Sequence, residues 1–438
     1  MSKVKASEKK ALVPRLRFPE FRDAGEWHEK TLSQSIERLD AGVSVNSGDR
    51  PATANERGIL KTSAVTDGVF DYKENKVVEE SEELVRLKEP VAKNTIIISR
   101  MNTPALVGAN AYIEKDHENL FLPDRLWAAK PKPNTSMRFI SYILGSEKGR
   151  SAIAELATGT SGSMKNISKA HILELPVILP DSDEQEKIAD CLSSLDALIT
   201  AQAEKIDALK SHKKSLMQQL FPREGETLPR LRFPKFRDAG KWDGLPLGKI
   251  ADFLSGATPL NERPDYWDGD IPWVSASSMH EVQISRSDRN ITQRAIDDGA
   301  RTIPKETLLI LVRGSMLHKR IPLGITTRTV AFNQDVKALR IKVEISTQFL
   351  LQLLISREDQ LLSTVSGTGI GAGKLDTKDL EEVFISLPAL KKEQQEIADC
   401  LSTLDTLIAA HTEKLNVLKI HKSGLIQQMF PSTKEIAV

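Results

Sequence analysis

The chain contains 438 residues, with 61 lysines and arginines against 60 aspartates and glutamates, and its formal net charge at pH 7 is +1. A chain of this length can bury two or three hydrophobic cores, which excludes a single small domain. Hydrophobic residues make up 40% and charged residues 28%, values that exclude a disordered chain and a disulfide-stabilised scaffold. Because the net charge is almost zero, any site for a polyanion must be local.

The sequence contains no apolar run near the roughly 20 residues that cross a bilayer. Its lysine-rich start, MSKVKASEKK, lacks the apolar stretch of a signal peptide. We therefore expect a cytoplasmic protein with no membrane partner. The two cysteines, Cys191 and Cys400, lack the spacing of a metal site and are expected to be free thiols that pack as small buried residues.

An N-terminal leader, residues 1–29, contains a segment that returns later in the chain. PRLRFPEFRDAGEW at residues 14–27 recurs as PRLRFPKFRDAGKW at residues 229–242, within a linker at residues 223–245. The two copies differ at Glu20/Lys235 and at Glu26/Lys241. The chain is therefore an internal duplication, and each half runs from leader to variable domain to long helix.

A variable domain follows each leader, at residues 30–180 and 246–388. Both mix short apolar runs typical of strands with turn residues, and each has one helix candidate, near residues 137–156 and 345–362. The strand-like runs are TIIISR (95–100), ELPVILP (174–180), TLLILVR (307–313) and EVFISLP (382–388). This mixture predicts α+β domains.

Each half ends in a long helix, predicted within residues 181–222 and within residues 389–438, which include the C-terminal tail. The two segments align without a gap, and apolar residues recur at the alternating spacing of 4 and 3 that is typical of coiled coils. Polar residues interrupt this pattern at matching positions, Gln202/His411 and Lys213/Lys422. We expect two helices of about 55 Å that pack against each other; the alternative is that each only closes the core of its own domain.

The glycine-rich sequence GTGIGAGK at residues 367–374 suggests a phosphate-binding loop, but it fails both nucleotide-binding patterns. A Walker loop needs serine or threonine where this chain has Leu375, and a first glycine where it has Thr368. The dinucleotide pattern GxGxxG also fails. The sequence therefore predicts no nucleotide site here.

The counterpart of this loop in the first half is GTSGSMKN, residues 159–166. Both segments are rich in small residues and are expected to form flexible loops, and a lysine stands at or near the end of each, Lys165 and Lys374. Such loops let backbone amides approach a phosphate closely while short hydroxyls reach base edges. The alternative is a mobile connector.

Comparison of the halves also suggests residues that contact DNA. Arg100, which ends IIISR, is matched with Arg313, which ends LILVR, and Asp124 is matched with Asp335. Arginine pairs well with guanine, and asparagine or glutamine with adenine. The candidate DNA-binding residues are Lys61, Thr62, Ser63, Arg100, Asn102, Arg125, Ser163, Lys165, Asn166, Ser275, Ser277, Arg313, Lys319, Arg320, Asn333, Gln334, Thr368 and Lys374.

Several of these candidates lie in a basic segment, residues 301–342, in which nine lysines and arginines face only two acidic residues. In the first half, Lys61 to Ser63 are matched with the hydroxyl cluster around Ser275. Trp273 is expected in the core.

The chain resembles the specificity subunits of type I restriction-modification systems. The resemblance covers nearly the whole chain and rests on the repeated order of segments, on EQxxIADCLSxLD in both halves, on DGDIPWVSASSM at 268–279 and on FNQDVKAL at 332–339. It implies two target-recognition domains joined by two long antiparallel helices, related by a pseudo-two-fold repeat. Each domain would read one half of a bipartite target on double-stranded DNA, and the helices would set the spacer.

The resemblance further implies partners that supply the chemistry. Two modification subunits would perform S-adenosylmethionine-dependent adenine methylation, and restriction subunits would use ATP and Mg²⁺. The chain itself would be non-catalytic and hold no cofactor and no metal, which agrees with its lack of an NPPY-type methyltransferase motif and of a Walker sequence. Two other readings stay open: a stand-alone DNA enzyme, and a coiled-coil scaffold that carries two protein-binding modules.

Overall fold

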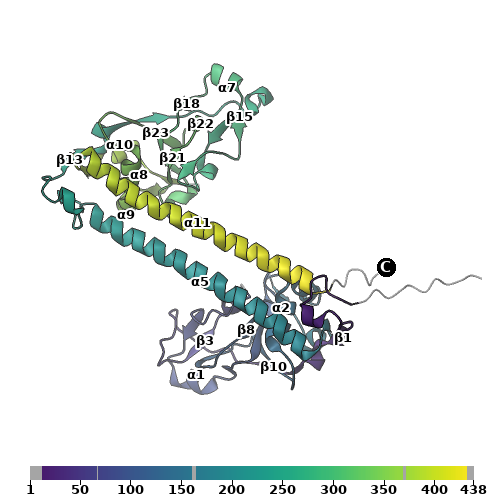
Figure 1. Ribbon diagram of the computed structural model, residues 1–438. Helices are drawn as coiled ribbons and strands as arrows, with labels where there is room; N and C mark the ends of the chain where they lie inside the picture. The colour runs from purple at the N-terminus through teal and green to yellow at the C-terminus, as the bar shows by residue number, and fades with distance from the viewer. Residues whose placement is uncertain (1–11, 67, 160–163, 368–370, 432–438) are drawn as a thin grey trace, which may run out of the picture. The chain divides into compact units, whose positions relative to one another are not determined.

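The computed structural model describes residues 12–66, 68–159, 164–367 and 371–431. It divides into two compact units, the first formed by residues 1–201 and 414–438 and the second by residues 202–413. Each unit contains one variable domain and one half of each long helix. Figure 1 shows the elements along the chain.

In the first unit, two four-stranded sheets carry the variable domain, in the orders β2-β10-β6-β8 and β4-β3-β9-β5. Two short ladders, β1-β12 and β11-β7, complete it. Its strands are β1 (His28–Thr31), β2 (Ile36–Ala41), β3 (Gly58–Leu60), β4 (Asn75–Val77), β5 (Pro90–Val91), β6 (Thr95–Ser99), β7 (Met101–Asn102), β8 (Asn110–Ile113), β9 (His117–Phe121), β10 (Leu126–Pro131), β11 (Lys165–Asn166) and β12 (Pro176–Leu179). Its short helices are α1 (Ser81–Arg86), α2 (Met137–Gly145), α3 (Glu147–Glu155) and α4 (Lys169–Leu173).

The second unit repeats this topology. Its sheets run β14-β23-β19-β21-β16 and β17-β15-β22-β18, with the ladders β13-β26 and β20-β25-β24. Its strands are β13 (Asp243–Pro246), β14 (Ala251–Ser255), β15 (Trp267–Val274), β16 (Gln283–Ile284), β17 (Asn290–Ile291), β18 (Thr302–Ile303), β19 (Leu308–Leu311), β20 (Arg313–Gly314), β21 (Leu323–Thr326), β22 (Val330–Phe332), β23 (Val336–Ile341), β24 (Ser366–Gly367), β25 (Gly373–Lys374) and β26 (Phe384–Leu387). Its short helices are α6 (Leu247–Ile250), α7 (Gln293–Asp297), α8 (Thr347–Ser356), α9 (Glu358–Ser363) and α10 (Thr377–Glu382).

The duplication seen in the sequence is therefore also a duplication of fold, and the α+β prediction is confirmed. In both domains a parallel pair, β3 with β9 and β15 with β22, is embedded among antiparallel strands. A glycine after the edge strand, Gly42 or Gly256, passes so close to a backbone carbonyl, of Leu122 or Phe332, that a β-carbon would overlap it. The second domain adds one edge strand, β16, to its larger sheet.

Each domain packs around one fully buried interior strand of a sheet, β6 in the first domain and β19 in the second. Ile96, Ile97 and Ile98 in β6 are fully buried, as are Leu308 to Leu311 in β19. A short, continuously apolar run is typical of a strand covered on both faces. The four strand-like runs predicted from the sequence all form strands, β6, β12, β19 and β26.

Each predicted helix candidate of the variable domains is in fact two helices, so the expectation of a single helix was wrong. In the first domain the chain leaves helical geometry at Ser146 (φ −63°, ψ 158°), whose hydroxyl accepts a hydrogen bond from the Gly149 amide and caps α3. In the second domain the break falls at Arg357, between α8 and α9.

The long helices are α5 (Ser182–Leu220) and α11 (Lys391–Met429), each of 39 residues, drawn in teal and yellow in Figure 1. In the second unit Gln202 donates to the backbone oxygen of His411 (2.8 Å), and Lys213 donates to Asp405 (2.6 Å). The contacting residue numbers therefore rise along α5 as they fall along α11, so the helices are antiparallel there.

The same helix contact occurs in the first unit with the roles exchanged. Lys422 of α11 donates to Asp196 of α5 at 2.6 Å, and these residues occupy the helix positions of Lys213 and Asp405. The polar positions predicted in the coiled-coil seam therefore make the contacts between the helices, and the prediction that the helices pack on each other is confirmed within each unit. Cys191 and Cys400, expected to be buried, are half-buried free thiols.

Candidate nucleic-acid interface

A short antiparallel ladder beside the glycine loop is common to the two domains, with two strands in the first and three in the second. β7 pairs with β11 in the first domain, and β20 pairs with β25 in the second. The strand that leaves the central sheet is thus joined directly to the strand that follows the loop. The structure brings Asn102 next to Lys165, and Arg313 next to Lys374, as cross-strand partners.

The register of the strands corrects the expected match between Arg100 and Arg313. Leu126 pairs with Ser99, and Val336 pairs with Leu311. Since β10 and β23 start at these residues, Arg100 corresponds to Val312, and Arg313 corresponds to Met101. The expected match of Asp124 with Asp335 is displaced by one residue in the same way, because β10 and β23 begin two residues after Asp124 and one after Asp335.

Arg100 is consequently held differently from Arg313. Its Nε donates to the backbone oxygen of Asp124 at 2.6 Å, and its guanidinium lies 3.7 Å from the Asp124 carboxylate and over the Trp127 ring. Its side chain is 25% exposed. Arg125 and Arg313 are exposed instead.

In the second domain, cations gather around β20 and the turn that follows it. Lys374 donates to Asp376 at 3.0 Å, and this contact lowers the pKa of the Asp376 carboxyl. Lys319 and Arg320 are exposed, and Arg320 also donates to the backbone oxygen of Met279 at 3.1 Å.

Other cations of the predicted basic segment make contacts within the protein. Arg340 and Lys342 both contact Asp252, at 2.8 and 2.9 Å, and together they lower the pKa of that carboxyl. Arg301 and Arg328 donate to backbone oxygens. Arg340 and Lys342 therefore have a counter-charge, whereas Arg301 and Arg328 are oriented by their hydrogen bonds and keep their positive charge.

Asn333 and Gln334 are engaged within the protein. The side-chain oxygen of Asn333 accepts from the amides of Asp335 (3.1 Å) and Val336 (3.2 Å), its amide donates to the Asp335 carboxylate, and the residue is 7% exposed. It shapes the turn between β22 and β23. Gln334 is exposed and accepts from Thr258 at 2.7 Å.

The polar residues predicted early in each domain occupy equivalent places. Lys61 to Ser63 follow β3, and Ser275 to Ser278 follow β15, in both cases at the start of a short 3-10 helix. Lys61 and Ser63 contact Glu74, whereas Ser275 lies 3.1 Å from Ser277. Asn166 is half-buried in β11, and Trp273 is buried as expected. Ser163 and Thr368 lie outside the described residues.

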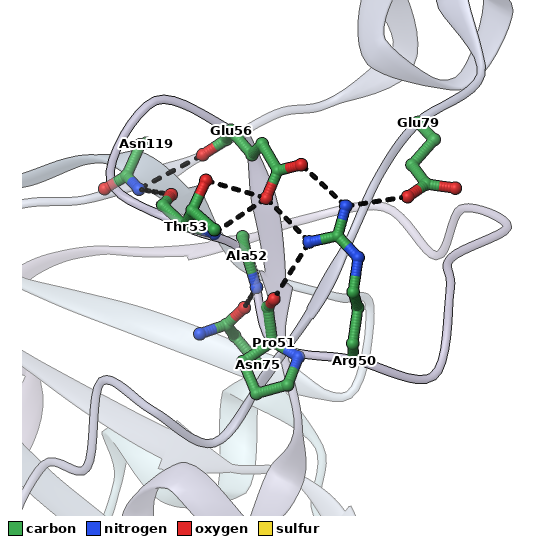
Figure 2. A network of polar contacts seen from close by, with 8 residues as sticks. All are labelled: Arg50, Pro51, Ala52, Thr53, Glu56, Asn75, Glu79 and Asn119. Atoms are coloured by element: carbon green, nitrogen blue, oxygen red, sulfur yellow. Dashed lines mark hydrogen bonds and ion pairs between the residues drawn. The ribbon is translucent and has the colours of Figure 1, made fainter.

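The sequence did not point to a polar network around Arg50 in the first domain (Figure 2). Arg50 donates to both carboxylate oxygens of Glu56, at 2.6 and 2.7 Å, and to Glu79 at 2.9 Å. These bonds, with those from Thr53, hold the pKa of the Glu56 carboxyl well below its usual range. The network fixes the loop that enters β3. Arg50, Thr53 and Glu56 are close in the sequence, but the contact with Glu79 joins distant parts of the chain and depends on the fold.

A second overlooked feature is Arg289 of the second domain. Its guanidinium carbon lies 3.5 Å from the ring centroid of Trp267 and 5.5 Å from that of Trp273. The two indole rings meet edge to face at 5.4 Å. Such stacking holds an exposed arginine in one orientation.

Within the part of the chain that the structure describes, no group of histidine, cysteine and acidic side chains is placed to hold a metal ion. In the same residues no helix is both long and apolar enough to cross a bilayer.

Comparison with known proteins gives a consistent result. The family model described as type I restriction modification DNA specificity domain matches residues 45–211 and 240–419. The EcoR124I/EcoR124II specificity subunit of Escherichia coli is 28% identical over 250 residues, 55% of this chain and 58% of that protein. The MjaIX specificity subunit of Methanocaldococcus jannaschii is 31% identical over 197 residues, 42% and 44% of the two chains. The matched regions thus span about half the length of these relatives.

Solved structures share the fold. The S subunit of a type I restriction-modification system from M. genitalium superposes with a TM-score of 0.60 at 18% identity, covering 96% of this chain and all of that one. A chain from a study of type I R-M complex assembly and conformational transition gives a TM-score of 0.52 at 16% identity, covering 93% and 98% of the two chains.

Proposed function

The chain belongs to the type I restriction-modification DNA specificity family, and from this premise we propose that it is the non-catalytic subunit that recognises the DNA sequence. Each variable domain reads one half of a bipartite target. The observation that carries this proposal is the repeated ladder beside the glycine loop, which has one topology and two sets of side chains. Met101, Asn102 and Asn166 in the first domain correspond to Arg313, Gly314 and Lys374 in the second.

The two domains also differ at the starts of their 3-10 helices, where Lys61 to Ser63 correspond to Ser275 to Ser278, so the two half-targets differ and the complete site is asymmetric. Side chains of different hydrogen-bonding capacity select different base edges in the major groove. The residues that we assign to the DNA interface are those at the ladders and at the starts of the 3-10 helices after β3 and β15, and the base contacts among them are assigned to the 3-10 helix starts and to the asparagines of the first ladder. Asn333 contributes through the turn that it holds rather than through a free amide.

The long helices keep the two readers apart and thereby set the unspecified spacer. Each has 39 residues, which corresponds to about 58 Å at 1.5 Å per residue. Half-sites on one face of B-DNA lie about 34 Å apart or a multiple of it. Helices of this length are able to bridge such a separation.

The chemistry resides on partner subunits in this proposal. Two modification subunits bind S-adenosylmethionine and methylate adenine, and restriction subunits use ATP and Mg²⁺ to move along and cut DNA. The complex acts in the cytoplasm, where the DNA is. This chain supplies no reacting group.

Exchange of one domain tests the proposal. Residues 246–388 are replaced by the corresponding domain of a relative whose target is known, and the modified adenines are mapped by methylome sequencing of cells that carry the full system. Only the second half of the target is expected to change. A change in both halves, or in neither, would contradict the assignment of one domain to each half.

Separate assays test the absence of catalysis and the role of the helices. The purified chain with S-adenosylmethionine and DNA is expected to transfer no methyl group until modification subunits are added. Insertion of four residues into α5 lengthens it by about 6 Å and is expected to change the preferred spacer. Methyl transfer by the chain alone would contradict the non-catalytic role, and an unchanged spacer would contradict the role of the helices.

A further inference from the structure

The second domain places two cations directly opposite each other, where the first domain has two neutral residues. Arg313 in β20 is the cross-strand partner of Lys374 in β25. At the equivalent positions Met101 in β7 is the partner of Asn166 in β11. Directly opposite residues of an antiparallel pair point to the same face of the ladder, with their β-carbons about 4.5–5.5 Å apart.

Two like charges at this separation destabilise the ladder unless an anion lies between them. Lys374 has a partial counter-charge in Asp376, but its side chain remains 43% exposed. Arg313 is exposed, and its side chain makes no hydrogen bond or ion pair with any residue in the described part of the chain. Two further exposed cations, Lys319 and Arg320, follow β20 in the chain.

We propose that Arg313 and Lys374 together bind one phosphate of the DNA backbone beside the second half-target, and that the first domain lacks this contact. The inference rests on the proposed function, because it takes DNA as the ligand. A guanine edge offers two acceptors that a single arginine satisfies. The second cation opposite it matches a full negative charge instead. Phosphate contacts fix the position of a protein on the duplex but carry no sequence information.

The matched variant is Arg313→Met with Lys374→Asn, which gives the second ladder the residue types of the first. Binding to the cognate duplex is measured as a function of salt, with the full-length chain assembled with its modification subunits. One lost phosphate contact is expected to reduce the slope of log K against log salt by about 0.9. Affinity should fall equally for the cognate duplex and for duplexes mutated in the second half. The charge-matched control, Arg340→Met with Lys342→Asn, removes two cations that are paired with Asp252 and should leave the slope unchanged.

Neutralising single phosphates of the DNA as methylphosphonates locates the contact. One position beside the second half is expected to weaken binding of the wild-type protein and to have no effect on the double variant. A misfolded variant would instead lose its response at many positions, and circular dichroism provides an independent check of its fold.

Two results would overturn the inference. If the salt slope is unchanged and discrimination is lost at one base pair of the second half, the two cations read a base. If neither changes, they do not contact DNA. A wild-type complex that binds all duplexes equally would refute the proposed function itself, and this outcome is distinct from both.

Discussion

Each leader segment is attached to a long helix by two ion pairs. One pair has the same residue types in both halves, and in the other the positive and negative residues are exchanged. In the first unit Arg17 forms a two-pronged ion pair with Glu184 at the start of α5, with both distances 2.7 Å. In the second unit Arg232 forms the same pair with Glu393 of α11, at 2.6 and 2.7 Å. All four side chains are at most 8% exposed.

Next to these pairs, the exposed contact reverses its charges. Glu20 of the first leader contacts Lys187 of α5, whereas Lys235 of the second leader contacts Glu396 of α11. A buried bidentate pair fixes the residue types, because only arginine matches a carboxylate in this way. An exposed pair needs only opposite signs, so both members can change together. One of the two positions at which the leader copies differ is therefore explained by its partner on the helix.

The buried pairs also differ in one detail, which leads to the largest expected effect. The Trp242 indole N–H donates to Glu393 at 3.3 Å, whereas the buried indole nitrogen of Trp27 has no partner among the described residues. Glu393→Ala leaves the Arg232 guanidinium without its counter-charge, and breaking such a buried pair costs about 3–5 kcal/mol. Glu184→Ala is expected to cost about 1 kcal/mol less, since it breaks one hydrogen bond fewer.

Hydrogen exchange measured by mass spectrometry checks this difference, because it reports the opening free energy of peptides from each unit separately. Glu396→Ala, which removes only the exposed contact, is the control in the second unit. Equal losses for Glu184→Ala and Glu393→Ala would show that the Trp242 hydrogen bond contributes nothing to stability.

The helix contacts provide the second prediction. Asp405 accepts from Lys213 and Gln352, and Asp196 accepts from Lys422 and Tyr142. Lys213 is 11% exposed and Lys422 is 24% exposed, so the ammonium that loses its partner is less hydrated in the second unit.

Asp405→Ala is therefore expected to lower the opening free energy by about 1–3 kcal/mol, and Asp196→Ala by less. The same exchange measurement on peptides of α5 and α11 gives both values. A larger loss for Asp196→Ala would mean that the Tyr142 contact, not the hydration of the lysine, decides the difference.

These contacts show what the sequence could reveal and what it could not. The duplication and the heptad spacing predicted both long helices, and the polar interruptions at Lys213 and Lys422 were found because they recur at matching positions. Their partners, Asp405 and Asp196, were not found, because they stand beside the predicted seam. The leader repeat was equally plain, but its attachment to Glu184 and Glu393 depends on tertiary contacts that no local pattern encodes.

The candidate interface was predicted less completely. The sequence named residues of the glycine loops and residues after β6 and β19 as separate DNA-binding candidates. It did not predict the ladders that bring Asn102 next to Lys165 and Arg313 next to Lys374. It matched Arg100 with Arg313 because both end similar apolar runs, but a one-residue difference in register turns a side chain to the other face of a strand. Asn333 was proposed as a base reader from its residue type alone. The residue type does not show that its side-chain amide already makes hydrogen bonds within the turn before β23.

The exposed ion pair between Glu20 and Lys187 is expected to contribute less to stability than the buried contacts. It is the most direct test of the comparison between the two leaders, because its charges are exchanged in the second unit. Lys187→Glu places two carboxylates together and is expected to destabilise the attachment of the first leader, while the double variant Glu20→Lys with Lys187→Glu recreates the arrangement of the second unit and should restore it. A double-mutant cycle on the exchange of leader peptides measures the coupling. Failure of the double variant to recover would show that the sign reversal depends on other neighbours.

The smallest expected effect is the pH dependence of this coupling. A backbone hydrogen bond at Glu20 and the Lys187 ammonium lower the pKa of the Glu20 carboxyl. A carboxyl whose pKa is lower in the folded state stabilises that state above its unfolded pKa, and this contribution disappears as the pH falls through the folded value. The Glu20–Lys187 coupling should therefore be present at neutral pH and absent well below the ordinary glutamate pKa of about 4.3, when the same cycle is measured in acid. Lys187 also lies over the Phe18 ring at 5.6 Å, so a coupling that survives acidification would instead assign the attachment to packing of the lysine on that ring.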